Sequence, residues 1–493
     1  MSLTKEAVFA QAREGKLWAG HLIPGHVAGD ARLENITPID NTLIGHIADG
    51  ASADIDAAVK AARECFEAGE WSRRSPAARK QAMYDWIALM REHAEELAAL
   101  DCVDAGKPIT ECLNTDMPAT LDTFAWYAEA IDKCFGKIAP TGPDALGMIV
   151  KEPIGVVGAV LPWNFPAQMY AWKVAPALAA GNSVVVKPAE LTSLSAYRMT
   201  QLAHQAGIPE GALTLVTGLG EAVGEPLGRH PDVDMVSFTG STEVGRMFLK
   251  YSAESNLKEI VLECGGKSPQ LVFDDAPIDD IIDHLLAAAF WNMGENCSCG
   301  SRLIVQSGIK DELLGKLKKR LDNWKVGLPT DESVQIGPLV EKVHFDKVKS
   351  FLDDARSEGA NLFHGGRVHA DLGSGWYIEP TIFDGVTPAM RLFREEVFGP
   401  ILAVTTFETE AEGLQLANDS AYGLAASIYT LDVRRAQRVA GAIRAGTVSV
   451  NGFSEGDITT PFGGYKHSGF GGRDNGLEAF EQYQQTKTIW YVN

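Results

Sequence analysis

Three side chains with the chemistry for acyl transfer lie in strand-end or loop segments of the chain. Cys297 lies in the polar stretch GENCSCGSR, which follows a predicted helix over residues 279–291. Most cysteines pack as small core residues, but one in a polar loop can be stabilised as a thiolate by nearby dipoles. Glu263 ends an apolar run before two glycines, and Asn164 offers an amide donor after another such run. Together they could serve as nucleophile, base and oxyanion donor.

The elements that must position these residues are predicted to form a parallel sheet. Four short apolar runs, at residues 155–161, 183–186, 213–216 and 235–238, are separated by helix-like segments at 167–180, 193–206 and 241–253. Continuous apolar strands alternating with helices indicate a parallel sheet covered on both faces. Ligands bind at the carboxyl edge of such a sheet, so the strand ends are candidate binding positions.

Two strand ends carry residues suited to a dinucleotide. The second run continues into Lys187 and Glu190, and the fourth continues into Ser241 at a helix start. Backbone N–H groups at a helix start bind phosphate. A carboxylate such as Glu190 accepts hydrogen bonds from ribose hydroxyls and repels a 2′-phosphate, which favours NAD over NADP. The glycines from Gly218 to Gly224 do not match GxGxxG and carry little weight alone.

A second alternating series begins near Leu271 and predicts a second α/β domain. Its strand-like runs lie at residues 303–305, 401–407, 424–429 and 447–450. The segment 486–492 is typical of a strand, but no partner lies near it in the sequence. It either pairs with another subunit or covers its own sheet.

Composition excludes several classes of function. The 493 residues carry a formal net charge of -21, which disfavours nucleic acid and anionic membranes. Neither a secretory signal nor an apolar run of about 18 residues is visible. Seven irregularly spaced cysteines indicate reduced thiols and a cytoplasmic protein. The chain lacks paired CxxC motifs and HExxH, so no metal site is expected.

Over nearly its whole length the chain resembles the aldehyde dehydrogenases. The segments PWNFP, KPAE, FTGSTEVG, ECGGKSP, GENCSCGSR, EEVFGP and PFGGYKHSG occur in that family's order and spacing. The resemblance implies an α/β fold with two Rossmann-like parallel domains and a small β oligomerisation element. It places the NAD-binding domain at 1–127 and 148–260, the catalytic domain at 261–460, and the oligomerisation strands at 128–147 and 478–493. It further implies a homodimer or homotetramer.

The resemblance also implies roles for individual residues. Cys297 matches the nucleophile, Glu263 the base and Asn164 the oxyanion donor, while Lys173 and Asp474 match a proton-relay pair. The positions matching contacts to NAD are Trp163, Lys187, Glu190, Gly220, Gly224, Ser241, Glu396 and Phe398. The implied reaction is oxidation of an aldehyde to the free acid through a thiohemiacetal and a thioester on Cys297.

The substrate of this reaction is predicted from the residues that match the family's aldehyde channel. These are the aromatic residues Phe165, Trp172, Trp291, Phe453 and Phe462 and the acidic residues Asp116, Glu455 and Asp457. Acids beside aromatic faces favour a cationic aldehyde. The chain is most similar to bacterial enzymes for γ-glutamyl-aminobutyraldehyde or guanidinobutyraldehyde, which predicts an ω-amino, γ-glutamylamino or guanidino aldehyde. The alternatives are a broad-specificity aliphatic or aromatic aldehyde dehydrogenase, an acylating coenzyme A-dependent enzyme, and an inactive structural relative.

Four departures from the family pattern lie close to the predicted site. Glu295 stands where relatives usually have an uncharged residue, His344 where many have glutamine, and Cys264 where leucine or alanine is common. The stretch 469–473 is one residue longer than in many relatives, which leaves the register of Asp474 open.

Overall fold

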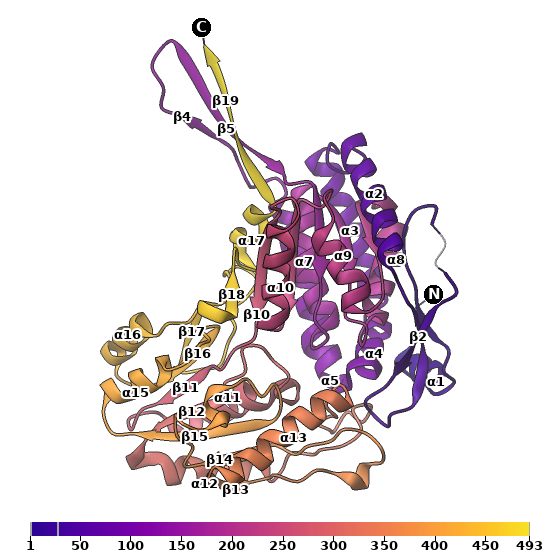
Figure 1. Cartoon of the computed structure of the whole chain (residues 1–493). Helices are drawn as coiled ribbons and strands as arrows, with labels where there is room; N and C mark the ends of the chain where they lie inside the picture. Colours follow the sequence, from indigo (N-terminus) through magenta and orange to yellow (C-terminus); the bar gives the residue numbers. More distant parts are fainter. Residues whose placement is uncertain (1, 27–28, 493) are drawn as a thin grey trace.

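The computed structural model describes residues 2–26 and 29–492 and shows two α/β units with a projecting three-stranded sheet (Figure 1). The first unit holds a six-stranded sheet of order β18-β10-β9-β6-β7-β8. Its strands are β6 (Val156–Val160), β7 (Ser183–Lys187), β8 (Leu213–Leu215), β9 (Met235–Gly240), β10 (Glu259–Cys264) and β18 (Gly469–Phe470). All neighbours pair in parallel except β10 and β18. The four predicted apolar strands are confirmed.

Helices cover both faces of this sheet, as the continuous apolar strands predict. One face packs against α2 (Ser52–Ala68), α9 (Glu225–Arg229) and α10 (Thr242–Ala253). The opposite core is built with α3 (Pro76–Glu92), α4 (Ala94–Ala105), α6 (Met117–Ala130), α7 (Pro166–Ala180), α8 (Leu194–Gln205) and α17 (Gly476–Gln482). An N-terminal helix α1 (Lys5–Arg13) and a small sheet of β1 (Leu17–Ala19), β2 (Arg32–Ile36) and β3 (Leu43–Ala48) flank this unit.

The second unit is built on a seven-stranded sheet of order β13-β14-β15-β12-β11-β16-β17. The strands are β11 (Pro269–Val272), β12 (Arg302–Gln306), β13 (Asn361–His364), β14 (Thr381–Asp384), β15 (Ile401–Phe407), β16 (Ala425–Tyr429) and β17 (Thr447–Val450). The helices are α11 (Ile278–Phe290), α12 (Lys310–Leu321), α13 (Lys342–Ser357), α14 (Arg391–Arg394), α15 (Glu410–Asn418) and α16 (Val433–Ala442). Only β13 runs antiparallel to its neighbour.

The projecting sheet consists of β4 (Lys137–Ala139), β5 (Ala145–Pro153) and β19 (Gln484–Val492), in the order β19-β5-β4. The C-terminal strand therefore has a partner in its own chain, since β19 pairs antiparallel with β5 over nine residues from Gln484 to Val492. The predicted domain boundary at 148 falls inside β5, and residues 148–153 belong to the projecting sheet rather than to the NAD-binding unit. The reason is the unbroken ladder with β19.

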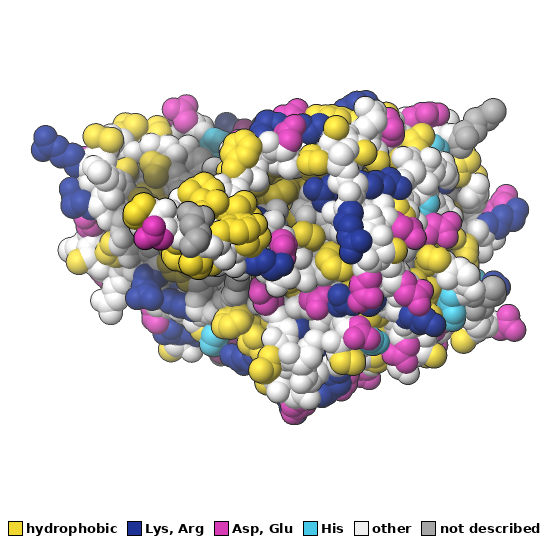
Figure 2. All heavy atoms as spheres, turned by 90° about the horizontal axis from the view of Figure 1, so that it is seen from above, with side chains coloured by type: hydrophobic (Ala, Val, Ile, Leu, Met, Phe, Trp, Pro, Cys, Tyr) yellow, Lys and Arg dark blue, Asp and Glu magenta, His cyan; other side chains and the backbone are white. Residues whose placement is uncertain are grey.

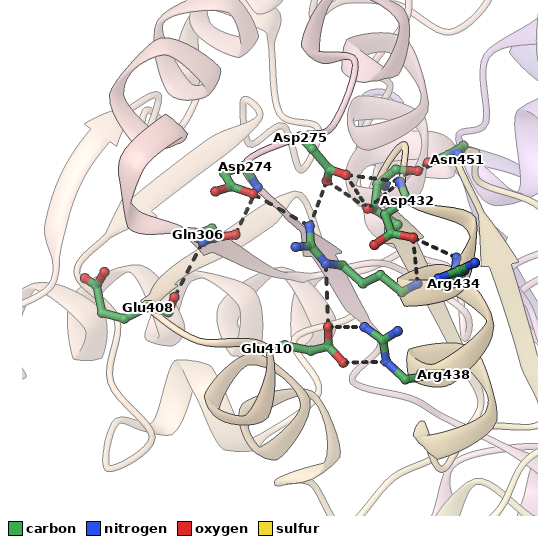
Figure 3. A network of polar contacts seen from close by, with 11 residues as sticks. Asp274, Asp275, Gln306, Glu408, Glu410, Asp432, Arg434, Arg438 and Asn451 are labelled. Atoms are coloured by element: carbon green, nitrogen blue, oxygen red, sulfur yellow. Dashed lines mark hydrogen bonds and ion pairs between the residues drawn. The ribbon is translucent and has the colours of Figure 1, made fainter.

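A polar network fixes the segment that follows β17 (Figure 3). The Asn451 side chain accepts a hydrogen bond from Thr430 N and donates one to Thr430 O, both at 2.9 Å. The Thr430 hydroxyl donates to Asp275, which also accepts from Arg435 at 3.0 Å. Asn451 adopts a φ of 56°, a conformation that asparagine tolerates better than most residues. The network therefore ties Asn451, the first residue after β17, to Thr430, the first residue after β16.

Candidate active site

One cavity of about 170 Å³ between the two units brings together the three residues with acyl chemistry. Cys297, Glu263 and Asn164 all line it. Because β6, β9 and β10 run in parallel, their carboxyl ends meet at one edge of the sheet. In the register, Glu263 lies opposite Thr239 of β9, so Glu263 and the helix start after β9 are adjacent.

Cys297 lies in the segment between α11 and β12, which crosses from the second unit into the cavity. Its side chain packs against an aromatic cluster and remains partly exposed. Burial raises the pKa of the Cys297 thiol well above its ordinary value, and the negative charges of Glu455, Glu263 and Glu396 add to that shift. Cys299, two residues on, is buried, and its Sγ lies 3.4 Å from Ala289 O. Cys299 is therefore a packing residue.

Glu263 is a buried carboxylate with neither oxygen hydrogen-bonded within the described chain. Burial raises its pKa well above the ordinary value, and Asp474 raises it further while Lys173 opposes the shift. Lys173 Nζ lies 2.6 Å from Asp474 Oδ2, and both side chains are buried. Asp474 also forms a backbone bridge to Phe462, which places it in the cavity wall. Asp474 therefore pairs with Lys173 in the wall of the cavity, and its role in a proton relay stays a prediction.

The dinucleotide candidates divide into two groups in the structure. Trp163, Ser241, Glu396 and Phe398 line the same cavity as Cys297. Glu396 is held there by Gly266 N, which donates to Oε1 at 2.8 Å. Lys187 and Glu190 lie at the end of β7 and pair at 2.9 Å. Gly220 and Gly224 do not line the cavity, but a Cβ added at either would meet no atom within 4 Å.

Two of the departures, Glu295 and His344, are buried beside this group. His344 packs against the rings of Trp163 and Phe398, with centroids 5.3 Å and 6.0 Å away, and those two rings are themselves 5.2 Å apart. Burial lowers the pKa of His344 to about 4, so the neutral ring donates from Nε2 to Phe398 O at 2.6 Å. Burial raises the pKa of Glu295 well above its ordinary value, and Oε1 accepts from Val340 N at 3.0 Å. Sequence reasoning gave neither residue a role.

Four of the five predicted aromatic positions form one cluster at Cys297. Phe165 packs on Trp291 and Trp172 packs on Phe462, with ring centroids 5.0 Å and 5.2 Å apart. Phe453 is the exception, because neither the cluster nor the cavity lining includes it. Its backbone N–H points to His284 Nδ1 at 3.4 Å. Phe453 is therefore corrected from a site residue to a residue of the neighbouring loop.

Asp116 was predicted to face a cationic substrate, and the structure corrects this. Its carboxylate is buried and lies 2.6 Å from Lys107 Nζ, which is also fully buried. Lys107 Nζ in turn lies 4.0 Å from the centroid of Phe165 and 5.3 Å from that of Trp291. Asp116 is thus neutralised by a cation that sequence reasoning missed. A lysine in a helix-rich N-terminal segment gives no sequence signal of such a partner.

Replacing Asp116 by asparagine is expected to destabilise the fold by about 3–5 kcal/mol, because Lys107 would remain buried without its counter-charge. The shift of the urea midpoint measures the effect. Asp122→Asn is the matched control, since Asp122 lies exposed on helix α6, which begins directly after Asp116. Equal, small shifts for the two variants would contradict the ion-pair interpretation.

The remaining acidic candidates differ in exposure. Glu455 is partly buried and accepts a hydrogen bond from the Ser298 hydroxyl, next to Cys297. Asp457 is exposed, and its carboxylate accepts from Thr459 N at 2.8 Å within its own turn. Asp457 is therefore corrected to a turn-capping residue.

Glu111 was missed: Oε2 accepts from Trp291 Nε1 at 2.9 Å, and it lines a hollow of about 280 Å³ behind that ring.

Among residues 2–26 and 29–492, no group of three or more His, Cys, Asp or Glu side chains is arranged to hold a metal ion. Within the same described ranges, no helix has the length and apolarity needed to cross a membrane.

The fold and the cavity place a partly exposed cysteine and a buried glutamate beside the carboxyl edge of a parallel sheet, and comparison with known proteins gives the family. The profile of the Aldehyde dehydrogenase family matches residues 26–489. The chain therefore belongs to the aldehyde dehydrogenase family, oxidoreductases that act on aldehydes.

Several relatives are similar over almost their full length. Aminoacetaldehyde dehydrogenase of Pseudomonas aeruginosa is 53% identical over 94% of this chain and 92% of its own. The NADP/NAD-dependent aldehyde dehydrogenase PuuC of Escherichia coli is 46% identical over 94% and 93%. Among solved structures, an indole-3-acetaldehyde dehydrogenase complexed with NAD+ is 44% identical, with a TM-score of 0.97 and complete coverage of both chains. A gamma-glutamyl-gamma-aminobutyraldehyde dehydrogenase from Burkholderia cenocepacia is 43% identical, covering 99% and 100%, with a TM-score of 0.95.

Proposed function

We propose that this chain oxidises an aldehyde to the free carboxylic acid with NAD, with Cys297 as nucleophile, Asn164 as oxyanion donor and Glu263 as base. The observation that carries the proposal is that all three line one cavity together with four of the dinucleotide candidates, Trp163, Ser241, Glu396 and Phe398. Bound NAD would supply the hydride acceptor, which converts a thiohemiacetal on Cys297 into a thioester.

The residues of the chain perform the remaining steps. The Cys297 thiolate attacks the carbonyl carbon, a C–S bond forms, and negative charge develops on the oxygen. Asn164 Nδ2 donates one N–H to Glu295 O at 2.9 Å, which leaves its second N–H for that oxygen. Glu263 then takes a proton from water as the water attacks the thioester. The C–S bond breaks, the carboxylic acid leaves, Cys297 returns to the thiolate, and Glu263 releases its proton to solvent.

Glu263 also decides between the free acid and a coenzyme A thioester as product. A buried carboxylate without a hydrogen-bond partner is suited to receiving a proton from water, and an enzyme that passes the acyl group to a thiol needs no such base. An inactive structural relative would not require the cavity to retain Cys297, Glu263 and Asn164 together. We therefore favour hydrolysis over both alternatives.

The preference for NAD is part of the proposal. Lys187 and Glu190 form an ion pair at the end of β7, and the Glu190 side chain is about one-third exposed. Its carboxylate can accept hydrogen bonds from the hydroxyls of a ribose and would repel a 2′-phosphate. The helix α10 begins at the cavity with Ser241 as its N-cap, so its free N–H groups can hold a pyrophosphate.

We further propose that the aldehyde carries an amino, γ-glutamylamino or guanidino group. Relatives at 53% and 43% identity are named for aminoacetaldehyde and gamma-glutamyl-gamma-aminobutyraldehyde. Glu455 and Glu111 lie near Cys297 and Trp291, and neither is paired with a lysine or arginine within the described residues. These two carboxylates, rather than Asp116 and Asp457, can face a cation beside aromatic rings.

The test compares Glu455→Gln with the unchanged chain on amino, guanidino, γ-glutamylamino, aliphatic and aromatic aldehydes, following NADH and the free acid. We expect kcat/KM for cationic aldehydes to fall about tenfold and that for neutral aldehydes to change little, because a partly desolvated charge pair contributes on the order of 1–2 kcal/mol. Asp457→Asn is the control, and its effect on kcat/KM should be the same for cationic and neutral aldehydes. If Glu455→Gln lowers both classes equally, or if the unchanged chain prefers aliphatic aldehydes, the cationic substrate is wrong.

We also propose that the chain forms a homodimer or homotetramer through the projecting sheet. Trp490, Tyr491 and Val492 of β19 are exposed, as are Ile138 and Leu146 of β4 and β5. Figure 2 looks down on this sheet and shows hydrophobic side chains gathered on it. β19 is also an edge strand with a free row of backbone groups. The cytoplasmic location stays a prediction from the cysteine content.

A further inference from the structure

The oxyanion donor and the nucleophile come from different units of the fold, so their relative position depends on whatever joins the two segments. Asn164 follows β6 of the first unit, and Cys297 follows α11 of the second. The distance between the attacking sulfur and the donor must be held to a few tenths of an ångström for catalysis, since misplacement by about 1 Å costs on the order of a hundredfold in rate. A direct contact between these segments is therefore functionally important.

Asn292 makes that contact. Its Nδ2 donates to Asn164 O at 2.8 Å and to Glu295 O at 3.0 Å, and its side chain is buried. Glu295 O accepts a further hydrogen bond, from Asn164 Nδ2 at 2.9 Å. The Glu295 carbonyl oxygen thus accepts hydrogen bonds from the side-chain amides of both Asn164 and Asn292, and Glu295 lies two residues before Cys297. These bonds connect the backbone of the donor to the segment of the nucleophile and orient the donor amide itself.

The backbone around Asn292 is built for this contact. Asn292 and Met293 have φ values of 51° and 57°, in the left-handed region that side chains rarely adopt. Gly294 has a φ of 71°, and a Cβ there would lie 2.4 Å from Gly399 O. Three left-handed residues in succession turn the chain sharply after α11. The strain is retained because the turn directs the Asn292 amide at Asn164.

We infer that Asn292 is a positioning residue, which sets the Asn164 amide for the oxyanion that forms on attack by Cys297. The inference rests on the roles proposed for Asn164 and Cys297. Asn292 itself touches neither the sulfur nor the developing oxyanion; it acts through Asn164 and the Glu295 carbonyl. Removing its two donated hydrogen bonds should therefore slow the step that develops negative charge and leave cofactor binding unchanged.

The experiment is a double-mutant cycle on the full chain, with the pre-steady-state rate of NADH formation as readout. The variants are Asn292→Asp, which keeps the shape and loses both donors, and Asn292→Gly, which tolerates the left-handed backbone. Each is made alone and together with Asn164→Ala. Asn41→Asp is the matched control, since Asn41 is an exposed left-handed asparagine remote from the cavity.

We expect Asn292→Asp and Asn292→Gly to slow NADH formation about tenfold, a fraction of the hundredfold or more expected for loss of an oxyanion donor. In the Asn164→Ala background the same changes should lower the rate of NADH formation less than about twofold. The dissociation constant for NAD should be unchanged in every variant. Equal losses in both backgrounds, or no loss with intact Asn164, would overturn the inference. If Asn164→Ala alone retains full activity, or the unchanged chain forms no NADH from any aldehyde, the proposed function fails instead.

Discussion

Replacing Cys297 by alanine is expected to abolish aldehyde-dependent NADH formation, with a loss of about 10⁵-fold or more in kcat. Without the sulfur there is no covalent intermediate, and removal of a nucleophile costs on that order in other enzymes of covalent catalysis. The measurement is NADH absorbance with saturating aldehyde, together with mass spectrometry of the acylated chain. The NAD dissociation constant should stay the same, because the substitution changes none of the side chains that are proposed to contact NAD.

Cys299→Ala is the matched control for this experiment. Cys299 lies two residues from Cys297, but it is buried with its Sγ at Ala289 O. It should retain most of the activity and lose only packing stability. Comparable activity in Cys297→Ala and the unchanged chain, or a comparable loss in Cys299→Ala, would contradict the assignment of the nucleophile.

The second large effect is expected for Glu263→Gln, which should leave a rapid burst of NADH and slow the following steady state by about 10²–10⁴-fold. The acyl group would form on Cys297 but water would attack it without a base. Stopped-flow absorbance resolves the two phases, and the thioester should be detectable by mass on the protein. Two outcomes would show that Glu263 is not the deacylating base. One is an unchanged steady-state rate, and the other is a variant in which both the burst and the steady-state formation of NADH are lost.

The pH dependence follows from the same carboxylate. Burial and the Asp474 charge raise the pKa of Glu263, so the ionised base is scarce at low pH and accumulates as the pH rises through that raised pKa. The steady-state rate of the unchanged chain should therefore climb with pH, and Glu263→Gln should lose this dependence. The burst should keep its own rise with pH, because burial also raises the pKa of Cys297.

The central strands of the first sheet could be predicted from local patterns alone. The residues of β6 and β7, and all but the last of β9, are buried because both faces of the sheet are covered, and the corresponding short apolar runs are visible without coordinates. The motifs around Cys297, Glu263 and Asn164 identified the family, and the profile match confirms it. The predicted domain boundary at 148 divides strand β5. The strand that pairs with β5 is β19, which lies more than 300 residues away in the sequence, so local patterns do not show where β5 ends.

The composition and motifs of the sequence by themselves determined the two α/β units, the family, and the chemical types of the site residues. Tertiary structure alone decided which acids remain unpaired. Asp116 and Asp457 are as acidic in the sequence as Glu455, yet one is neutralised by Lys107 and another caps its own turn. It also decided that Asn292 joins Asn164 to the Cys297 segment, across 128 positions of chain. The physical reason is that charge compensation and hydrogen bonding depend on which groups meet after folding, and distant residues leave no periodic signal of that meeting.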